Sequence, residues 1–291
     1  MPKVAILYIA LGRYIVFWRD FYESCQDKLM NCEKHYFVWT DNPDFDYANA
    51  KNVTVISAQK RGWPYDTLLR FEMFLQQEKQ LKKFDFVYFF NANMQFINPT
   101  DLAEIAPAEW NDGLVAGCHP GRPWAFENPD VLPYERREQS TAYIPYGSGK
   151  YYVCGAFNGG TASEYLKMCK TLAKNIRTDL EKDIIARVDD ESHLNWYMLQ
   201  HNFRFLGRAY GYPEGKMKHL HDPQDRSMIK IISRHKEDPK YGGKRYLRGE
   251  TDRKAPNNWF VRHVLIPGCR VIAVFIPVHK YRSRVRGYFG S

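Results

Sequence analysis

The sequence predicts an α/β fold in which helices cover the faces of a sheet. Short apolar segments of strand length lie at residues 4–10, 36–39, 53–57 and 86–90. Segments with apolar residues at helical spacing lie among them, at 14–29 and 66–83. Strands and helices that follow one another in this way are typical of a sheet with helices packed against it. The 291 residues, 44% of them hydrophobic, are enough for one large or two small domains with a substantial core.

Each of these elements has its own signal in the sequence. Residues 4–10 are an uninterrupted apolar run, which suits a strand buried on both faces, and Gly12 ends it. Asp66 is of a residue type that caps helices, so we expect the helix that runs to about residue 83 to begin there. Further helices are expected at 161–175 and 190–201.

Two stretches of the chain carry less periodicity. Residues 109–160 are rich in Pro, Gly and Tyr, which suits an elaborated binding region. Beyond residue 211 regular periodicity fades, and residues 236–258 are polar enough to form a mobile arm.

Composition argues against several classes of protein. No segment reaches the roughly 18 apolar residues of a membrane span, and the first apolar run ends at about residue 11, too early for a signal peptide. The six cysteines are scattered without CxxC pairs, which favours buried free thiols over a zinc site or a disulfide framework. We therefore expect a cytoplasmic protein.

The net charge of +9 is concentrated toward the C-terminus. From residue 230 onward, 15 Lys and Arg stand against four Asp and Glu, so the preceding residues are slightly acidic. The basic segment is expected to meet an anionic partner: a nucleotide diphosphate, lipid headgroups or nucleic acid. The lack of any recognition motif argues against nucleic acid.

Two segments occupy the carboxyl ends of predicted strands, where ligands bind in such sheets. They are residues 9–14 and the tripeptide Asn91-Ala92-Asn93. Asparagine side chains can donate hydrogen bonds to phosphate or sugar hydroxyls. On its own, however, Asn-x-Asn after a strand is an ordinary turn.

Seven segments resemble, in the same order, the motifs of the histo-blood-group A/B and α-1,3-galactosyltransferase family. They are 9–14 (IALGRY), 69–73 (LRFEM), 90–94 (FNANM), 119–121 (HPG), 134–145 (YERREQSTAYIP), 152–160 (YVCGAFNGG) and 190–195 (DESHLN). The segments at 134–145 and 152–160 are long and specific, and the resemblance covers about residues 4–215. The chain is most similar to bacterial members, since Asn-x-Asn replaces the Asp-x-Asp of other members.

The resemblance implies an A-type nucleotide-sugar transferase fold, a Rossmann-like mixed sheet flanked by helices, and a retaining enzyme that uses a UDP-sugar. It also implies a division of the chain. Residues 1–248 would form the catalytic domain, and 249–291 a basic C-terminal extension. Within the catalytic domain we expect a nucleotide-binding part at about 1–110, an acceptor-binding part at about 111–215 and a basic closing arm at about 228–248.

The resemblance assigns binding of the donor to residues from several segments. They are Ile9, Ala10, Leu11, Tyr14, Arg70, Asn91, Ala92, Asn93, Cys154, Gly155, Ala156, Asp190 and Lys236, with Arg248 or Arg245 as a second cation of the arm. Both acids of Asp-x-Asp are amides here, and an amide is a weaker ligand for a hard cation, so we expect no metal cofactor. Cationic side chains would then stabilise the charge on the departing UDP.

Glu191 is the expected catalytic residue. Asp190 is expected to cap the helix that it begins, which places Glu191 in the first turn, where the helix dipole favours an ionised carboxylate. A retaining mechanism needs such a carboxylate, as nucleophile or as stabiliser of positive charge on the sugar ring. The alternative is that Glu191 serves only as a capping carboxylate.

The resemblance also bears on the two sugars. Cys154 is smaller than the Leu or Met usual at its position, which leaves space for an acetamido group, whereas Ala156 leans toward galactose; we favour N-acetylgalactosamine over galactose. His119 and Glu214 are the expected acceptor-binding residues, and Val188 stands where relatives carry a Trp that stacks on the acceptor. The expected acceptor is a galactose-containing glycan, fucosylated as in the H antigen and joined in α-1,3 linkage. The alternative is a catalytically decayed sugar-binding protein of the same fold.

The end of the chain combines apolar segments with clustered cations. Aromatic and aliphatic residues between 259 and 276 precede Lys280, Arg282, Arg284 and Arg286. This combination suits adsorption onto anionic lipid, so we expect peripheral contact with the inner face of the cell membrane. The alternative is an extra strand and helix packed on the domain, and sedimentation with phosphatidylglycerol vesicles distinguishes the two.

Overall fold

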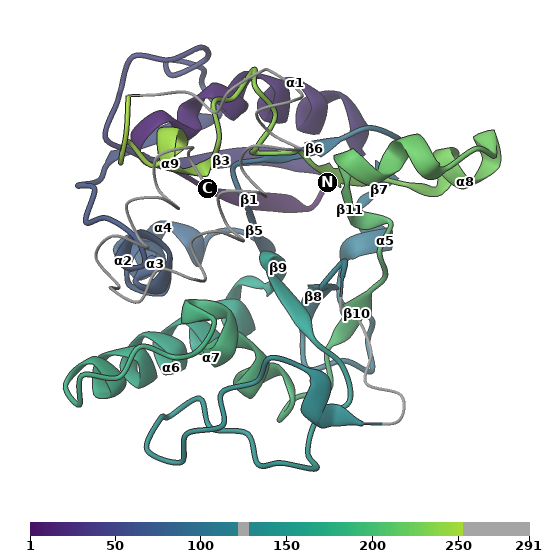
Figure 1. Ribbon diagram of the computed structural model, residues 1–291. Coiled ribbons are helices and arrows are strands. Elements are labelled where there is room, and N and C mark those ends of the chain that lie inside the picture. The colour runs from purple at the N-terminus through teal and green to yellow at the C-terminus, as the bar shows by residue number, and fades with distance from the viewer. Residues whose placement is uncertain (122–127, 253–291) are drawn as a thin grey trace, which may run out of the picture.

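A seven-stranded mixed sheet forms the centre of the computed structural model, which describes residues 1–121 and 128–252 (Figure 1). The strand order is β10-β8-β9-β5-β1-β3-β4. Strand β9 is antiparallel to both neighbours, and the other pairs are parallel. The strands are β1 Lys3–Ala10, β3 Glu33–Thr40, β4 Val53–Ser57, β5 Phe86–Phe90, β8 Leu114–Cys118, β9 Val153–Thr161 and β10 Arg204–Leu206. The expected mixed α/β sheet is confirmed.

Helices cover both faces of this sheet (Figure 1). Helix α1 (Trp18–Lys28) packs on one face, and α3 (Arg70–Leu75), α6 (Ala162–Leu180) and α7 (Asp189–Met198) pack on the other. The other helices of the described residues are η1 Gly12–Phe17, α2 Tyr65–Leu68, α4 Glu78–Leu81, α5 Leu102–Ile105, η2 Pro129–Val131, η3 Glu214–His219, α8 Pro223–Met228 and α9 Lys244–Leu247. Two small sheets join β11 Tyr210–Pro213, β12 Ile231–Ser233 and β6 Met94–Phe96, and β2 Leu29–Met30 with β7 Thr100–Asp101.

The central strands bury both of their faces. Ala5 and Leu7 of β1 join the core beneath α6, whereas Ile6 and Tyr8 join the core beneath α1, and all four are fully buried. Successive side chains of a strand point to opposite faces, so a strand covered on both sides needs apolar residues at every position. This explains the uninterrupted apolar run of β1.

The predicted helices differ from the observed ones at their starts. The segment expected as a helix from residue 14 begins with the 3-10 turn η1, and the helix expected from Asp66 is divided into α2, α3 and α4. Asp66 does not cap α2: its carboxylate accepts hydrogen bonds from the backbone N–H groups of Arg61 (2.6 Å) and Gly62 (3.1 Å), which closes the preceding turn. The N-cap residue is Pro64.

Strands β8 and β9 were not predicted from the hydrophobic pattern. β9 contains three glycines, which lower strand propensity and suggest a loop. The structure shows why one of them is needed. A Cβ on Gly159 would overlap the ring of Tyr88 and lie 2.7 Å from the carbonyl oxygen of Val87, because Gly159 of β9 pairs directly with Tyr88 of β5.

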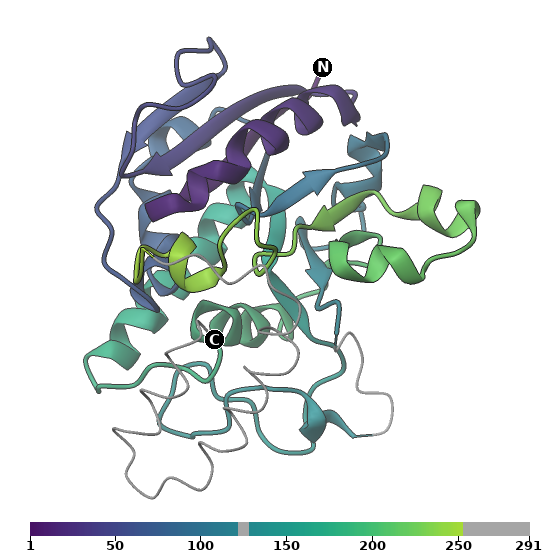
Figure 2. The same cartoon turned by 45° about the horizontal axis from the view of Figure 1, so that its top comes forward.

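The basic arm packs against the start of α1 (Figure 2). The rings of Phe17 and Tyr241 lie 4.3 Å apart between their centroids, and Leu247 of α9 is fully buried beside them. Gly12 has a φ of 65°, and a Cβ there would lie 2.9 Å from the carbonyl oxygen of Leu247. Within the segment predicted to be a mobile arm, two apolar residues, Tyr241 and Leu247, thus anchor residues 236–252 to the rest of the fold.

No helix within residues 1–121 and 128–252 is long and apolar enough to cross a membrane. The basic extension expected at 249–291, with its membrane-binding cations, lies almost wholly in 253–291, outside the described residues.

Replacing Gly159 by alanine should reduce the free energy of unfolding by more than about 2 kcal/mol, because the packed sheet has no room for the methyl group. Gly215→Ala is the matched control, since a Cβ there meets no atom within 4 Å. Chemical denaturation of both variants measures the difference. A Gly159→Ala protein as stable as the control would contradict this packing.

Candidate active site

A cavity of about 250 Å³ lies at the carboxyl ends of β1 and β5. Most of the residues expected to bind the donor line it. Those residues are Ile9, Leu11, Tyr14, Arg70, Asn91, Cys154, Gly155, Ala156, Asp190, Lys236 and Arg248, together with the expected catalytic residue Glu191. Segments far apart in the chain therefore converge on one site.

Three of the expected donor residues do not line this cavity. The carbonyl oxygen of Ala10 accepts a hydrogen bond from Thr40, and that of Ala92 accepts one from the hydroxyl of Tyr8, so both residues serve the core of the sheet. The side chain of Asn93 is buried and donates to Ser233 Oγ at 3.0 Å, on the segment that leads into the arm.

Glu191 is held between α7 and β9. Its Oε2 accepts a hydrogen bond from the backbone N–H of Gly155 at 2.7 Å. Asn195, one helical turn further on, joins the same two elements: its Oδ1 accepts from the N–H of Val153 at 2.9 Å, and its Nδ2 donates to the carbonyl oxygens of Val153 (3.0 Å) and Glu191 (2.8 Å). The carboxylate is thus fixed against the strand that forms the cavity wall.

Arg70 and Asp190 form an ion pair beside Glu191, and both side chains are more than 90% buried. The guanidinium also donates to the carbonyl oxygen of Gly155 at 2.7 Å and lies 4.7 Å from the ring centre of Phe89. The expectation that Asp190 caps its helix is wrong. The N-cap residue is Val188, and the helix begins at Asp189, because the Asp190 carboxylate is turned inward to Arg70.

Burial changes the ionisation of this cluster. It raises the pKa of Glu191 to about 7, against the opposing hydrogen bond from Gly155, and it raises the pKa of Asp189 to about 6. Glu191 does lie in the first turn of α7, as expected. The helix dipole alone, however, does not keep its carboxylate fully ionised, because the cost of desolvating the charge is larger here.

The arm brings cations to the opposite side of the cavity. Lys236 Nζ lies 5.1 Å from the ring centre of Tyr14, and burial, with the nearby charges of Lys244 and Arg248, lowers the pKa of Lys236 to about 8. The guanidinium carbon of Arg248 lies 5.0 Å from the ring centre of Trp63. Of the two expected second cations, Arg248 lines the cavity and Arg245 does not. Both form ion pairs with Glu250.

The two expected acceptor residues lie outside the cavity lining. The backbone N–H of His119 donates to the carbonyl oxygen of Tyr152 at 2.9 Å, and the two rings meet edge to face. Glu214 forms an ion pair with Arg234 (2.9 Å) and accepts a hydrogen bond from the N–H of His235 (2.9 Å). Val188, in contrast, is part of the cavity wall.

Several cavity residues were not predicted as donor-binding residues. They are Lys60, Trp63, Asp66, Thr67, Phe89 and Asp189. The first four lie before and within α2. Lys60 and Trp63 precede the periodic segment, and the helical pattern of 66–83 does not show that its first residues face the site. Phe89 was predicted only as part of a strand.

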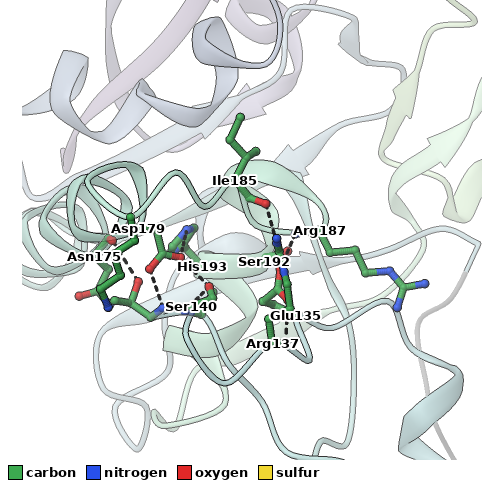
Figure 3. A network of polar contacts seen from close by, with 12 residues as sticks. Glu135, Arg137, Ser140, Asn175, Asp179, Ile185, Arg187, Ser192 and His193 are labelled. Atoms are coloured by element: carbon green, nitrogen blue, oxygen red, sulfur yellow. Dashed lines mark hydrogen bonds and ion pairs between the residues drawn. The ribbon is translucent and has the colours of Figure 1, made fainter.

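The longest family-like segment, residues 134–145, braces the start of α7 from outside the cavity (Figure 3). Glu135 accepts hydrogen bonds from the side chain of Arg137 and from the backbone N–H of Arg187 (2.7 Å). Ser140 donates to Asp179 near the end of α6 at 2.5 Å. Burial opposes ionisation of Glu135, but these hydrogen bonds prevail and lower its pKa to about 2. The segment therefore positions the helix that carries Glu191.

The described residues do not fit a divalent cation held in the manner of Asp-x-Asp. No group of three or more His, Cys, Asp or Glu side chains in 1–121 and 128–252 is placed to hold a metal ion. Asn91 faces the cavity, but Asn93 donates its amide hydrogens to the arm segment. The two side chains therefore do not converge on one ligand.

A carboxylate fixed at the carboxyl ends of a mixed sheet, with cations facing it across one cavity, suits an enzyme that takes a sugar from a nucleotide. The family model for glycosyltransferase family 6 matches residues 3–240, and the chain belongs to that family. The fold is accordingly the A-type fold of these enzymes, and the substrates are a nucleotide-sugar donor and a carbohydrate acceptor.

Curated relatives come from bacteria and vertebrates. The chain is 33% identical over 214 residues to the O-antigen biosynthesis glycosyltransferase WbnI of Escherichia coli, a match that covers 72% of this chain and 88% of that one. It is 29% identical over 225 residues to globoside alpha-1,3-N-acetylgalactosaminyltransferase 1 of Gallus gallus, covering 74% and 63% of the two chains. For histo-blood group ABO system transferase 2 of Rattus norvegicus the identity is 28% over 206 residues, covering 68% and 59%. The chain thus spans about three fifths of these vertebrate relatives.

Glu191→Gln should stabilise the fold at alkaline pH. Because burial raises the pKa of Glu191 from 4.5 to about 7, ionisation is harder in the folded than in the unfolded chain, and the wild type loses stability as the pH rises from 4.5 through 7. The variant avoids this cost, so it should be more stable than the wild type by about 1–3 kcal/mol at pH 8 and nearly equal to it at pH 4.5.

Urea denaturation at the two pH values measures this difference. Glu181→Gln, at an exposed position, is the control and should show no such pH-dependent gain. A Glu191→Gln protein that gains no stability at pH 8 would show that the carboxylate ionises there without cost.

Proposed function

We propose that this protein is a retaining glycosyltransferase that moves N-acetylgalactosamine from UDP-N-acetylgalactosamine to a galactose-containing acceptor in α-1,3 linkage, without a metal ion. The observation that carries the proposal is the position of Glu191, held by Gly155 in the same cavity that Lys236 and Arg248 reach from the arm. The name of the chicken relative, an alpha-1,3-N-acetylgalactosaminyltransferase, supports the linkage and the sugar.

The reaction requires stabilisation of two opposite charges. Departure of UDP leaves negative charge on its diphosphate, and the cavity offers Lys60, Lys236, Arg248 and Asn91 to stabilise it. Positive charge develops on the sugar ring at the same time. The ionised form of Glu191 offsets it, either through space or by attacking the anomeric carbon before the acceptor does.

Arg70 contributes to this site indirectly. Its charge is already balanced by Asp190, so it adds little net positive charge for the diphosphate. Its hydrogen bond to the Gly155 carbonyl instead fixes the strand whose N–H holds Glu191. We propose that the Arg70–Asp190 pair orients the donor sugar through polar contacts and keeps the catalytic carboxylate in place.

We propose that residues of β9 select the donor sugar. Cys154 and Ala156 line the cavity on either side of Gly155, where a Cβ would lie 3.2 Å from Asp190 and 3.3 Å from Arg70. The small side chain of Cys154 leaves room for an acetamido group, which favours N-acetylgalactosamine over galactose. The acceptor is proposed to be a fucosylated galactoside bound near His119 and Glu214, with the small Val188 leaving space where relatives carry a Trp.

A panel of nucleotide sugars tests this proposal, with a fucosylated galactoside as acceptor and EDTA present throughout. UDP-N-acetylgalactosamine should be the best donor, UDP-galactose slower, and added manganese should change the rate little, because Asn91 and Asn93 supply no carboxylates. Complete loss of activity in EDTA that manganese restores would refute metal independence. UDP-sugar binding without any UDP release would support the alternative, a decayed sugar-binding protein.

Glu191→Gln should lower kcat by about 10²–10⁴-fold and change the KM for the donor only severalfold, because the lost charge matters most when positive charge develops on the sugar. Steady-state kinetics with the preferred donor measures both constants, with Glu181→Gln as the control. Near-normal turnover of the variant would reduce Glu191 to a residue that stabilises the start of α7.

A further inference from the structure

We infer that Asn93 and Arg234 are positioning residues that fix Lys236 over the donor cavity, so that the second Asn of Asn-x-Asn ties the arm to the sheet. The inference rests on the proposed function only in assigning Lys236 to the diphosphate. It gives Asn93 of the tripeptide a role in positioning the arm. The replacement of two metal-ligating acids by amides would not by itself require such a role.

The contacts of Asn93 carry the first part of this inference. Its side chain is 4% exposed, and Nδ2 donates to Ser233 Oγ at 3.0 Å and to the carbonyl oxygen of Arg234 at 2.8 Å. Its own carbonyl oxygen accepts a hydrogen bond from the N–H of Arg234 at 2.7 Å. Three hydrogen bonds therefore join Asn93, which lies between β5 and β6, to the end of β12: one reaches Ser233, the last residue of the strand, and two reach Arg234, which follows it.

An aspartate could not make the same contacts. The carbonyl oxygen of Arg234 only accepts hydrogen bonds, so a carboxylate oxygen in place of the Asn93 Nδ2 would meet it without a hydrogen between them. The other oxygen, Oδ1, is already buried without a donor. An Asp at this position would thus bury a charge against the Arg234 carbonyl, with the Ser233 hydroxyl as a donor for one oxygen, and such a burial is costly.

The side chain of Arg234 carries the second part. It is 11% exposed and bridges segments from across the chain: an ion pair with Glu214 at 2.9 Å, one with Asp20 of α1 at 3.2 Å, and a hydrogen bond to Gln95 of β6. Its guanidinium carbon lies 5.7 Å from the ring centre of Tyr241 in the arm. Arg234 is therefore held in place both by the hydrogen bonds of its main chain and by the contacts of its side chain.

Lys236 follows two residues later and enters the cavity. Two of the cavity's cations, Lys236 and Arg248, belong to the arm, so their positions at the diphosphate depend on the course of the arm. The anchor at residues 93 and 234 sets the start of that course, and the packing of Tyr241 and Leu247 sets its continuation.

Isothermal titration of UDP into wild-type protein, Asn93→Asp, Lys236→Met and the double variant tests the inference. Asn93→Asp should weaken UDP binding by about tenfold, as Lys236→Met does, and the double variant should be no weaker than Lys236→Met alone, because both changes remove the same cation from the site. Additive losses in the double variant, or unchanged binding by Asn93→Asp, would overturn the inference. So would UDP binding by Asn93→Asp that manganese restores.

Asn111→Asp is the matched control, since it also puts a carboxylate at a largely buried position. There Oδ1 already accepts a hydrogen bond from the N–H of Ala108, and Nδ2 has no partner, so the change should leave UDP binding as in the wild type. Should Asn93→Asp fail to fold, Ser233→Ala removes one of the two acceptors and should weaken UDP binding in the same direction, by about two- to threefold. Wild-type affinity in Ser233→Ala would then count against the anchor.

A wild-type protein that does not bind UDP would refute the proposed function without deciding the anchor. Hydrogen exchange of the backbone amides at residues 234–249 then decides it. Exchange should be faster in Asn93→Asp than in the wild type and unchanged in Asn111→Asp. Equal exchange in all three proteins would overturn the anchor itself.

Discussion

The buried ion pair between Arg70 and Asp190 is the interaction on which the rest of the site depends. A charge removed from water this completely is tolerated only with its partner in place, so the pair holds α3 and α7 together on one face of the sheet. Arg70 also binds the carbonyl of Gly155, whose N–H holds Glu191, and a Cβ at Gly155 would crowd the pair, at 3.2 Å from Asp190 and 3.3 Å from Arg70. Loss of either charge would leave the other buried and unpaired, and would disturb the strand and the Glu191 carboxylate together.

The sequence allowed prediction of those elements whose own residues determine them. β5 has the expected bounds because both faces of a central strand are buried, which leaves an uninterrupted apolar run. β4 also has the expected bounds, although it lies at the edge of the sheet and is only partly buried. β9 could not be found in this way, because close packing against Tyr88 requires a glycine that weakens the pattern. The direction of the Asn93 side chain was equally hidden, since its partners lie 140 and 141 residues further along the chain.

The segment that carries the clearest family resemblance does not touch the donor cavity. Residues 134–145 bind Asp179 and the N–H of Arg187 on either side of the loop that precedes α7. The resemblance in this segment therefore reflects a requirement for holding a helix in place. The same holds for Gly12, whose left-handed conformation allows the arm to approach the end of β1. Motifs identified the family correctly, whereas only the structure separates the residues that line the site from those that support it.

The charged residues that line the cavity come from the core of the fold and from two segments that cover the cavity, the α2 connection and the arm. The core contributes Arg70, which Asp190 neutralises, and the further acids Asp189 and Glu191, whereas Lys60, Lys236 and Arg248 come from the α2 connection and the arm. The core alone would thus repel a diphosphate, and attraction comes from the periphery. Attraction that depends on partly exposed cations is screened by dissolved salt. Capture of the nucleotide, and equally its release after transfer, should therefore respond strongly to ionic strength, while the chemistry at Glu191 responds little.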